Sequence, residues 1–369
     1  MNVIGRSSRP RPRMHGLTGA AHRPRRRVRL GLVLVIALCP AGCHRNLPES
    51  ATKPVGFVGM TMGTSYSVKV SRLPAGLTLP QLRNEVNRRL ERLNAFMSTY
   101  RTDSDVSRFN TSTSTGWFPV SRDTAVVVAA AQRISRMTRG AFDVTVAPLV
   151  DLWHFGPGNG EFRVPTEEQI QSAKQRVGFE NLDVRLDPPA LRKRRADLAI
   201  DLSAIAKGYA VDQVAAYLES RGIDGFLVEI GGETRTKGSK ADGQPWRVGI
   251  ERPDATRLAV LRAIELGDRA IATSGDYRNF FVMDGKRYSH EIDPRTGRPI
   301  EFRLALVSVV AESCMTADAL ATAIMVLGVQ DGYNFAVDHA LAVLMVERTS
   351  GGLQVKMTPR FQRLFGSGP

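Results

Sequence analysis

Apolar positions recur at helical spacing in three stretches of the first half of the chain. In residues 78–97 they share one helix face, at Leu82, Val86, Leu90, Leu93 and Met97. Pro80 falls in the first turn of this helix, where its missing backbone N–H does no harm. Two more helices are predicted over residues 123–138, just before Arg139-Gly140, and over residues 166–177.

Short apolar runs separate these helices and predict strands. Residues 55–70 form a strand pattern interrupted at Met62-Gly-Thr64, and residues 198–202 predict a strand followed by a helix from Ser203 to about Arg221. The second half of the chain predicts strands over residues 226–230, 246–251, 259–266, 270–273, 280–283, 304–311 and 342–347, with a last long helix over 316–327. Runs of strands with irregularly placed helices predict an α+β fold, not a doubly wound parallel sheet.

The first 42 residues have the composition of an export signal. Basic residues 23–29 precede an apolar stretch, residues 30–39, which is too short for a comfortable membrane span. Ala41 and Gly42 stand directly before Cys43, as in bacterial lipoprotein cleavage sites, although Pro40 replaces the usual Leu. We therefore predict a signal peptide over 1–42, lipidation of Cys43, a tether over 43–54 and a domain over 55–369 on the periplasmic face of a bacterial inner membrane. A signal without lipidation is the alternative.

Charge and cysteine content narrow the class of protein further. Nine arginines in the leader account for most of the +15 net charge and leave only +6 for the rest, so nucleic acid is not an expected partner. Beyond Cys43 the chain has one cysteine, Cys314, which cannot form an internal disulfide and is expected to be a buried small hydrophobe.

The alanine-rich helix predicted over 316–327 presents two hard oxygen ligands on one face. Asp318 and Thr322 are four residues apart, so their side chains lie one above the other. A carboxylate and a hydroxyl suit Mg²⁺. The alternative is structural: Thr316 caps the helix and Asp318 complements its dipole.

A second candidate is the predicted strand-to-helix junction Asp201-Leu-Ser203-Ala204-Ile-Ala-Lys207. Free N–H groups at a helix N-terminus favour phosphate, and Lys207 lies one turn inside if Ser203 begins the helix. The segment lacks the glycines of a phosphate-binding P-loop. Ser203 as a simple cap and Lys207 as a solvated charge are the alternative.

His290 is the candidate for proton transfer. It precedes Asp293-Pro294-Arg-Thr-Gly297, a strong turn signal that would hold the histidine at a strand end. The chain has only six histidines, and an imidazole has an ordinary pKa of about 6.5, suited to neutral pH. A packed or surface histidine is the structural alternative.

Eight segments, in order from residue 62 to residue 322, together resemble the ApbE family of FAD:protein FMN transferases. They are Met62-Gly-Thr-Ser-Tyr66, Met97-Ser-Thr-Tyr100, Gly140-Ala-Phe-Asp-Val-Thr-Val-Ala-Pro148, Asp201-Leu-Ser-Ala-Ile-Ala-Lys207, Glu229-Ile-Gly-Gly-Glu233, Ala272-Thr-Ser-Gly-Asp-Tyr277, His290-Glu-Ile-Asp-Pro-Arg-Thr-Gly297 and Thr316-Ala-Asp-Ala-Leu-Ala-Thr322. Glu291 departs from the family pattern, which commonly has an apolar residue there.

The resemblance implies a two-lobed, T-fold-like α+β architecture with mainly antiparallel sheets, flanking helices and FAD in the cleft between the lobes. It assigns FAD contacts to Met62, Tyr100, Ala141, Phe142, Asp143, Asp201, Lys207 and Ile292. It assigns Mg²⁺ to the Ala204 carbonyl, Asp318 and Thr322.

The activity that the resemblance implies is transfer of the FMN half of FAD to a Thr or Ser hydroxyl of an acceptor flavoprotein, with release of AMP. The implied acceptors are subunits of membrane redox complexes, such as the sodium-translocating NADH:quinone reductase or the Rnf type. We expect His290 to act as general base, with an acidic residue at the metal as the alternative. Two other functions stay open: an Mg²⁺-dependent FAD pyrophosphatase and a non-catalytic FAD-binding lipoprotein.

Overall fold

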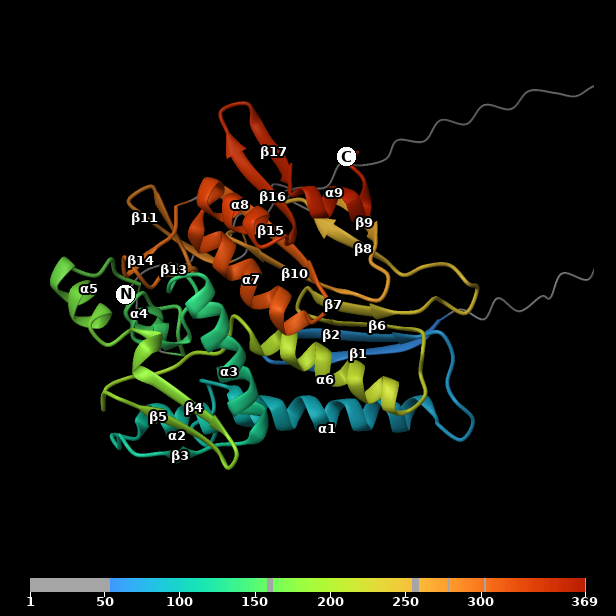
Figure 1. Ribbon diagram of the computed structural model, residues 1–369, viewed down its shortest axis with the longest axis horizontal. Helices are drawn as coiled ribbons and strands as arrows, with labels where there is room; N and C mark the ends of the chain where they lie inside the picture. Colours follow the sequence, from blue (N-terminus) through green and yellow to red (C-terminus); the bar gives the residue numbers. More distant parts are fainter. Residues whose placement is uncertain (1–53, 158–161, 254–258, 278, 302, 369) are drawn as a thin grey trace, which may run out of the picture. The chain divides into compact units, whose positions relative to one another are not determined.

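An eight-stranded sheet organises the part of the chain that the computed structural model describes, residues 54–157, 162–253, 259–277, 279–301 and 303–368 (Figure 1). In spatial order its strands are β1 (Val55–Thr61), β2 (Thr64–Val70), β6 (Phe226–Ile230), β7 (Glu233–Lys237), β10 (Ala270–Gly275), β15 (Leu304–Ala311), β16 (Ala342–Thr349) and β17 (Gly352–Met357). Each neighbouring pair is antiparallel, so the α+β prediction with mainly antiparallel sheets is confirmed.

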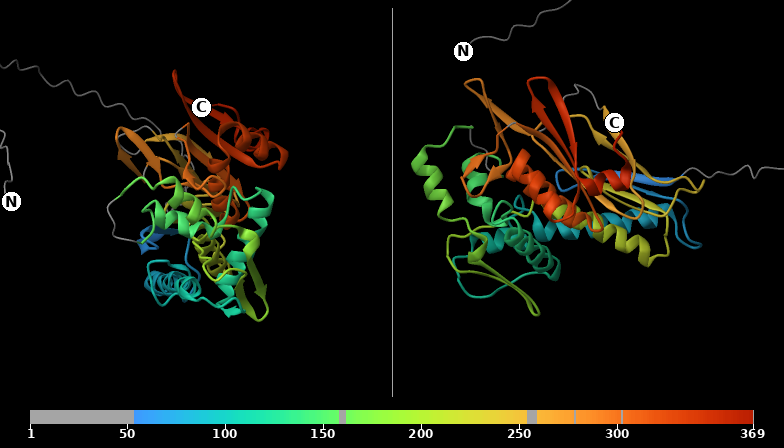
Figure 2. Two further views of the ribbon diagram at one scale, coloured as in Figure 1. Left: turned by 90° about the vertical axis from the view of Figure 1, so that its left-hand side faces the viewer. Right: turned by 45° about the horizontal axis from the view of Figure 1, so that its top comes forward.

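Three helices line one face of this sheet: α1 (Leu79–Met97), α6 (Ala206–Ser220) and α7 (Cys314–Leu327). Figures 1 and 2 show them along the same side. The five apolar residues that predicted α1 are all buried. Thr78 caps it in a capping box, because its hydroxyl accepts from the Gln81 N–H while the Gln81 side chain accepts from the Thr78 N–H.

Among the described residues, the opposite face is covered by packed elements at one end of the sheet. The hairpin of β8 (Arg247–Glu251) and β9 (Val260–Glu265) and the helix α9 (Pro359–Phe365) pack there. They bury a second apolar cluster that includes Ile250, Ile264, Ile271, Leu306, Leu344 and Phe361. This cluster covers β10, β15 and β16, whereas no residue of β1, β2 or β6 belongs to it.

The remaining elements flank the sheet and complete the core. They are α2 (Asp105–Thr111), β3 (Phe118–Pro119), α3 (Arg122–Met137), a 3-10 turn (Val144–Val146), α4 (Ala147–Leu152), α5 (Glu167–Lys174), a second 3-10 turn (Phe179–Asn181), β4 (Leu182–Leu186), β5 (Pro189–Lys193), β11 (Phe280–Met283), β12 (Lys286–Ser289), β13 (Ile292–Asp293), β14 (Arg298–Pro299) and α8 (Val329–Asp338). None of the described helices combines the length and hydrophobicity needed to cross a membrane. The predicted leader, the lipidation at Cys43 and most of the tether lie outside the described residues.

The strand predicted over residues 198–202 is wrong. Leu198, Ile200 and Leu202 are buried with the alternation that suggested a strand, but their backbone pairs with no strand in the described part of the chain. The amide side chain of Asn110 instead bonds both the N–H and the C=O of Ile200 at 2.8 Å. One polar side chain therefore supplies the hydrogen bonds that a neighbouring strand would provide.

The predicted starts of two helices are also wrong. α6 begins at Ala206, not Ser203, and Ile205 stands at its N-cap without a side-chain hydrogen bond. α7 begins at Cys314 and is capped by Ser313, whose hydroxyl accepts from the Thr316 N–H. Thr316 is therefore not the cap, and Lys207 lies in the first turn of α6.

Candidate active site

A cavity of about 1190 Å³ opens beside the sheet where several chain segments converge. Its wall includes the β1–β2 turn, the loop after α1, the first turn of α6, the glycine pair after β6, the end of β10 and one face of α7. Every predicted FAD, metal and catalytic residue lines it: Met62, Tyr100, Ala141, Phe142, Asp143, Asp201, Ala204, Lys207, His290, Ile292, Asp318 and Thr322. The structure thus brings these twelve residues to one site, and their individual roles stay predictions.

Three charged side chains form what we call the ionic centre: Lys207, Glu233 and Asp318. The Lys207 Nζ lies 2.7 Å from Glu233 Oε1 and 3.9 Å from Asp318 Oδ1. Glu233 is 2% exposed and Asp318 is 4% exposed, so both carboxylates are buried. A lysine held between two buried carboxylates places a fixed positive charge at the cavity wall.

The close approach of α6 and α7 explains this grouping. A Cβ on Gly208 would lie 2.4 Å from the Cys314 carbonyl oxygen and 2.8 Å from the Asp318 Cβ, so only glycine fits there. The Gly208 N–H donates to Asp318 Oδ2 at 2.9 Å. Asp318 therefore caps α6 from the neighbouring helix, where Ile205 cannot, and is held beside Lys207.

Burial and mutual attraction together set the protonation of the ionic centre. Burial raises the pKa of Glu233 to about 7 and raises that of Asp318, while the nearby Lys207 charge opposes both shifts. Burial alone would lower the pKa of Lys207, but the charges of Asp318 and Glu233 outweigh it and raise that pKa. Lys207 is thus positively charged at neutral pH.

The oxygens available to a metal are hard ones. Thr322 follows Asp318 by one turn of α7, and its hydroxyl lies 3.1 Å from the Ser274 hydroxyl at the end of β10. Ala204 lines the same cavity. No cluster of three His, Cys, Asp or Glu side chains with metal-binding geometry occurs among the described residues. One carboxylate with neutral oxygens fits Mg²⁺, which takes few protein ligands and completes its shell with phosphate and water.

His290 lies on the cavity wall and is oriented by the backbone. Its Nδ1 donates to the Asn279 carbonyl oxygen at 3.0 Å, which leaves Nε2 as the basic nitrogen. Burial lowers the pKa of His290, and the charge of Lys207 lowers it further. The imidazole is therefore neutral at neutral pH, the state that a general base requires.

Two of the predicted FAD residues have their polar groups engaged within the protein. The Asp143 carboxylate accepts from the Thr145 N–H and hydroxyl and from the Phe179 N–H, and burial raises its pKa to about 6. Asp201 Oδ1 accepts from the Ser203 N–H at 2.7 Å. Both carboxylates therefore hold loops of the cavity wall in place.

The expectation of free N–H groups for phosphate at the start of α6 is wrong in part. The Ala206 N–H donates to the Leu202 carbonyl oxygen, and the Gly208 N–H donates to Asp318. The anion-attracting group at this point is the Lys207 ammonium more than the helix terminus.

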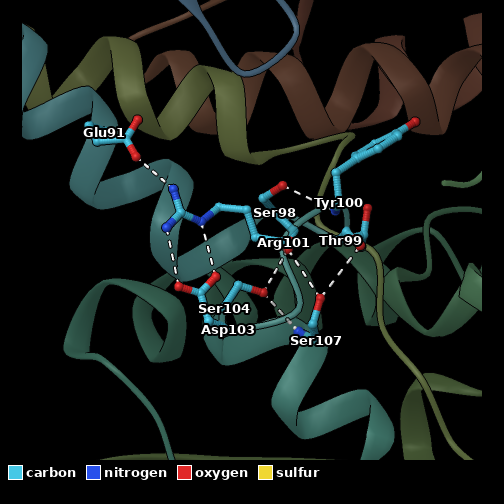
Figure 3. A network of polar contacts seen from close by, with 8 residues as sticks. All are labelled: Glu91, Ser98, Thr99, Tyr100, Arg101, Asp103, Ser104 and Ser107. Carbon is cyan, nitrogen blue, oxygen red and sulfur yellow. Dashed lines mark hydrogen bonds and ion pairs between the residues drawn. The ribbon is translucent and has the colours of Figure 1, made fainter.

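Polar contacts of the loop after α1 surround the backbone of Tyr100 (Figure 3). Its N–H donates to the Ser98 hydroxyl, and the next residue, Arg101, pairs with Glu91 and Asp103. The ring points away from this polar network and is 71% exposed. An aromatic face presented in this way suits a planar ring system.

Glu233 is the main site residue that the sequence-based assignment left out. It stood in the motif after the glycine pair, but no local spacing relates it to Lys207, which is 26 positions earlier. A carboxylate directly after Gly231-Gly232 at a strand end was the available signal. Ser274 was likewise within a named turn, whereas nothing in the sequence indicated Asn279 as the partner of His290.

Comparison with known proteins identifies the family of this chain. The model of the ApbE family matches residues 62–345. This chain belongs to the ApbE family. The FAD:protein FMN transferase of Vibrio cholerae is 46% identical over 90% of this chain and 97% of its own. The protein of the same name from Escherichia coli (strain K12) is 37% identical over 89% of this chain and 95% of its own.

Solved ApbE structures share the fold. The flavin transferase ApbE from Vibrio cholerae has a TM-score of 0.79 at 46% identity, over 85% of this chain and 99% of its own. The Pseudomonas stutzeri flavinyl transferase ApbE, in its apo form, also has a TM-score of 0.79, at 43% identity over 86% and 98% of the two chains. These similarities confirm the predicted ApbE-like α+β fold.

Proposed function

We propose that this protein is an FAD:protein FMN transferase that moves the FMN half of FAD onto a Thr or Ser hydroxyl of an acceptor flavoprotein. The observation that carries the proposal is the ionic centre, a fixed ammonium beside a hard-oxygen carboxylate on the wall of a cavity. Such a site suits a pyrophosphate, and relatives at 46% and 37% identity bear this enzyme name.

The proposed reaction is one displacement at phosphorus. The acceptor oxygen forms a bond to the FMN-side phosphorus, the bond from that phosphorus to the AMP half breaks, and His290 Nε2 takes the hydroxyl proton. Lys207 binds the pyrophosphate and stabilises the charge on the departing AMP. The Ala204 carbonyl, Asp318 and Thr322 would hold Mg²⁺, which supplies Lewis-acid polarisation of the phosphate oxygens.

Two other functions use the same cavity and are separable by products. An FAD pyrophosphatase releases AMP and FMN with water as acceptor, and a non-catalytic carrier releases neither. The test is incubation of the protein with FAD and Mg²⁺, with and without an acceptor containing Thr, followed by assay of AMP and of covalently bound flavin. AMP that depends on the acceptor, in equal amount with bound flavin, supports transfer. Equal AMP without the acceptor, or no AMP at all, contradicts it.

We further propose that Cys43 carries a lipid that tethers the enzyme to the periplasmic face of the inner membrane, near flavoprotein subunits of membrane redox complexes. The support is the leader: a basic stretch, a short apolar stretch and small residues before Cys43. Cys43→Ser should release the protein from the membrane fraction or block its processing. Unchanged membrane retention with normal processing would refute lipidation at this residue.

A further inference from the structure

His290 stands at the end of a hairpin that has little support of its own. The hairpin consists of β11 and β12, and His290 follows directly after β12. In the described part of the chain these two strands pair only with each other. An isolated two-stranded hairpin is marginally stable in water, so neighbouring elements must fix the position of His290.

One hydrogen bond does not fix the imidazole by itself. The Nδ1 of His290 bonds the carbonyl oxygen of Asn279, the residue directly before β11. This bond anchors one nitrogen, but the plane of the ring can still tilt about it, and Nε2 moves with the plane. A second contact on the ring is needed to set the direction of Nε2.

Phe155, just after α4, supplies that second contact. The centroids of the Phe155 and His290 rings lie 6.3 Å apart and their planes are 66° apart, an edge-to-face arrangement that aromatic pairs favour. Phe155 also lines the cavity, although it is not among the twelve predicted FAD, metal and catalytic residues. The imidazole is therefore held by a hydrogen bond at Nδ1 and by a ring against its plane.

A local backbone motif places Phe155 beside the cavity. α4 ends in a Schellman motif, in which the His154 N–H donates to the Asp151 carbonyl oxygen at 3.0 Å. The Phe155 N–H donates to the Val150 carbonyl oxygen at the same distance. His154 has a φ of 58°, in the left-handed region where glycine is usual, and a Cβ on Gly156 would clash with the Asp151 carboxylate. The end of the helix thus determines the direction of Phe155.

Further rings support Phe155 from the hairpin. Phe281 of β11 packs on it with the centroids 4.7 Å apart, and Phe162 stacks on Phe281 at 4.2 Å. Trp153, two residues before Phe155, stacks on Tyr288 of β12 at 5.7 Å. These contacts join the end of α4 to both strands of the hairpin, so the hairpin and Phe155 are held as one unit.

The charges near His290 act on its pKa in opposite directions. Lys207 of α6 lowers the pKa, whereas Asp276, directly after β10, raises it. The Asp276 carboxylate is itself bound by both terminal nitrogens of Arg348, at 2.6 and 2.7 Å. Burial has the largest influence on the pKa of His290 and lowers it. Removal of an aromatic ring beside the imidazole should therefore raise this pKa toward its ordinary 6.5.

We propose that Phe155 is a positioning residue for His290, which holds the plane of the imidazole so that Nε2 meets the acceptor hydroxyl. The inference rests on the proposed transferase function, in which Nε2 takes the proton of that hydroxyl. Phe155 acts through His290 and not on the phosphates. Proton transfer requires the two heavy atoms within hydrogen-bond reach, so a tilted imidazole lowers the rate without weakening the binding of FAD.

The test is Phe155→Leu, which keeps an apolar side chain and removes the ring. The kcat for transfer should fall by about three- to thirtyfold, while the Kd for FAD stays unchanged. The acidic fall in the pH–rate profile should move to higher pH, because the pKa of His290 rises. Phe281→Leu, which removes the ring behind Phe155, should act in the same direction and by less. Phe335→Leu is the matched control, because Phe335 of α8 packs on His339 at 4.3 Å away from the cavity wall, and it should change none of these values.

NMR of histidine-labelled protein without FAD measures the pKa of His290 directly, with its signal assigned by its loss in His290→Gln. Three results would overturn the inference: an unchanged His290 pKa in Phe155→Leu, a rise in the Kd for FAD that accounts for the lost rate, or an equal loss of rate in Phe335→Leu. If the His290 pKa rises as expected but the wild type never forms covalent flavin, the transferase function fails while the positioning of His290 by Phe155 stands.

Discussion

At the ionic centre the carboxylates of Glu233 and Asp318 are buried and share Lys207, whereas elsewhere on the cavity wall Lys69 and Arg247 are exposed and have no ion-pair partner among the described residues. Buried charges are costly to remove singly, because the remaining partner stays desolvated. Exposed charges contribute little to stability and remain free to bind and release a partner. Substitutions at the ionic centre should therefore disturb both stability and activity, whereas substitutions at Lys69 or Arg247 should leave stability almost unchanged.

The largest expected effect is at Asp318, one of the two buried carboxylates of the ionic centre. Asp318→Ala should abolish transfer, because it removes the only charged ligand predicted for Mg²⁺. Lys207 keeps its ion pair with Glu233, so the main loss is the cap on α6, worth about 0.5–2 kcal/mol of unfolding free energy, and the protein should stay folded. Activity and circular dichroism check this, with Asp338→Ala, at an exposed position of α8, as the control. Near wild-type transfer at saturating Mg²⁺ would remove Asp318 from the metal site.

The next largest effect is expected at His290. His290→Gln should lower kcat by about 10²–10⁴-fold if Nε2 is the general base. Because burial lowers the pKa of His290 from its ordinary 6.5, the wild-type rate should hold through neutral pH and fall only in more acidic solution. The pH–rate profile of the variant should lack this fall in rate at acidic pH. If the variant keeps the fall, another group performs the proton transfer.

A smaller effect is expected at Lys207. Lys207→Ala should weaken transfer by about ten- to a hundredfold, because one charge-assisted contact to phosphate is lost, and Lys207→Arg should cost less. Riboflavin has no phosphate, so its binding should be indifferent to either change. Fluorescence titration of FAD and riboflavin compares the two. Equal weakening of both ligands would show that Lys207 supports the flavin ring or the fold.

The smallest effect on rate is expected at Glu291, a buried carboxyl on the cavity wall whose Oε2 has no hydrogen-bond partner among the described residues. Burial, aided by the charge of Asp276, raises the pKa of Glu291 to about 8 from 4.5. Between pH 4.5 and about pH 8 the folded protein keeps a proton on Glu291 that the unfolded chain releases. The free energy of unfolding therefore falls as pH rises through this range.

Glu291→Gln should remove this contribution. Denaturant unfolding from pH 5 to pH 8 should show a slope smaller than that of the wild type by up to about 1.4 kcal/mol per pH unit. Glu301→Gln, at an exposed position, is the matched control and should keep the wild-type slope. Identical slopes for wild type and Glu291→Gln would show that this carboxyl is ionised in the folded protein.

The sequence by itself determined the elements whose signals are local. The helix α1 followed from apolar spacing and its first-turn proline, and the β1–β2 hairpin followed from two apolar runs around Met62-Gly63. The shared helix face of Asp318 and Thr322 followed from their four-residue spacing. The family motifs named twelve residues that the fold gathers around one cavity.

Only the tertiary structure decided which groups are partners. Residues 198–202 alternate as a strand does, yet the N–H and C=O of Ile200 bond the Asn110 side chain, 90 positions earlier. One interpretation of the sequence was that Asp318 complements the dipole of its own helix. In the structure it accepts from the Gly208 N–H, so it caps α6 and lies beside Lys207. Glu233 joins them, and among the described residues α9 and the β8–β9 hairpin bury only the part of the outer sheet face formed by β10, β15 and β16. Spacing along a chain specifies local geometry, whereas the pairing of distant groups depends on how whole elements pack.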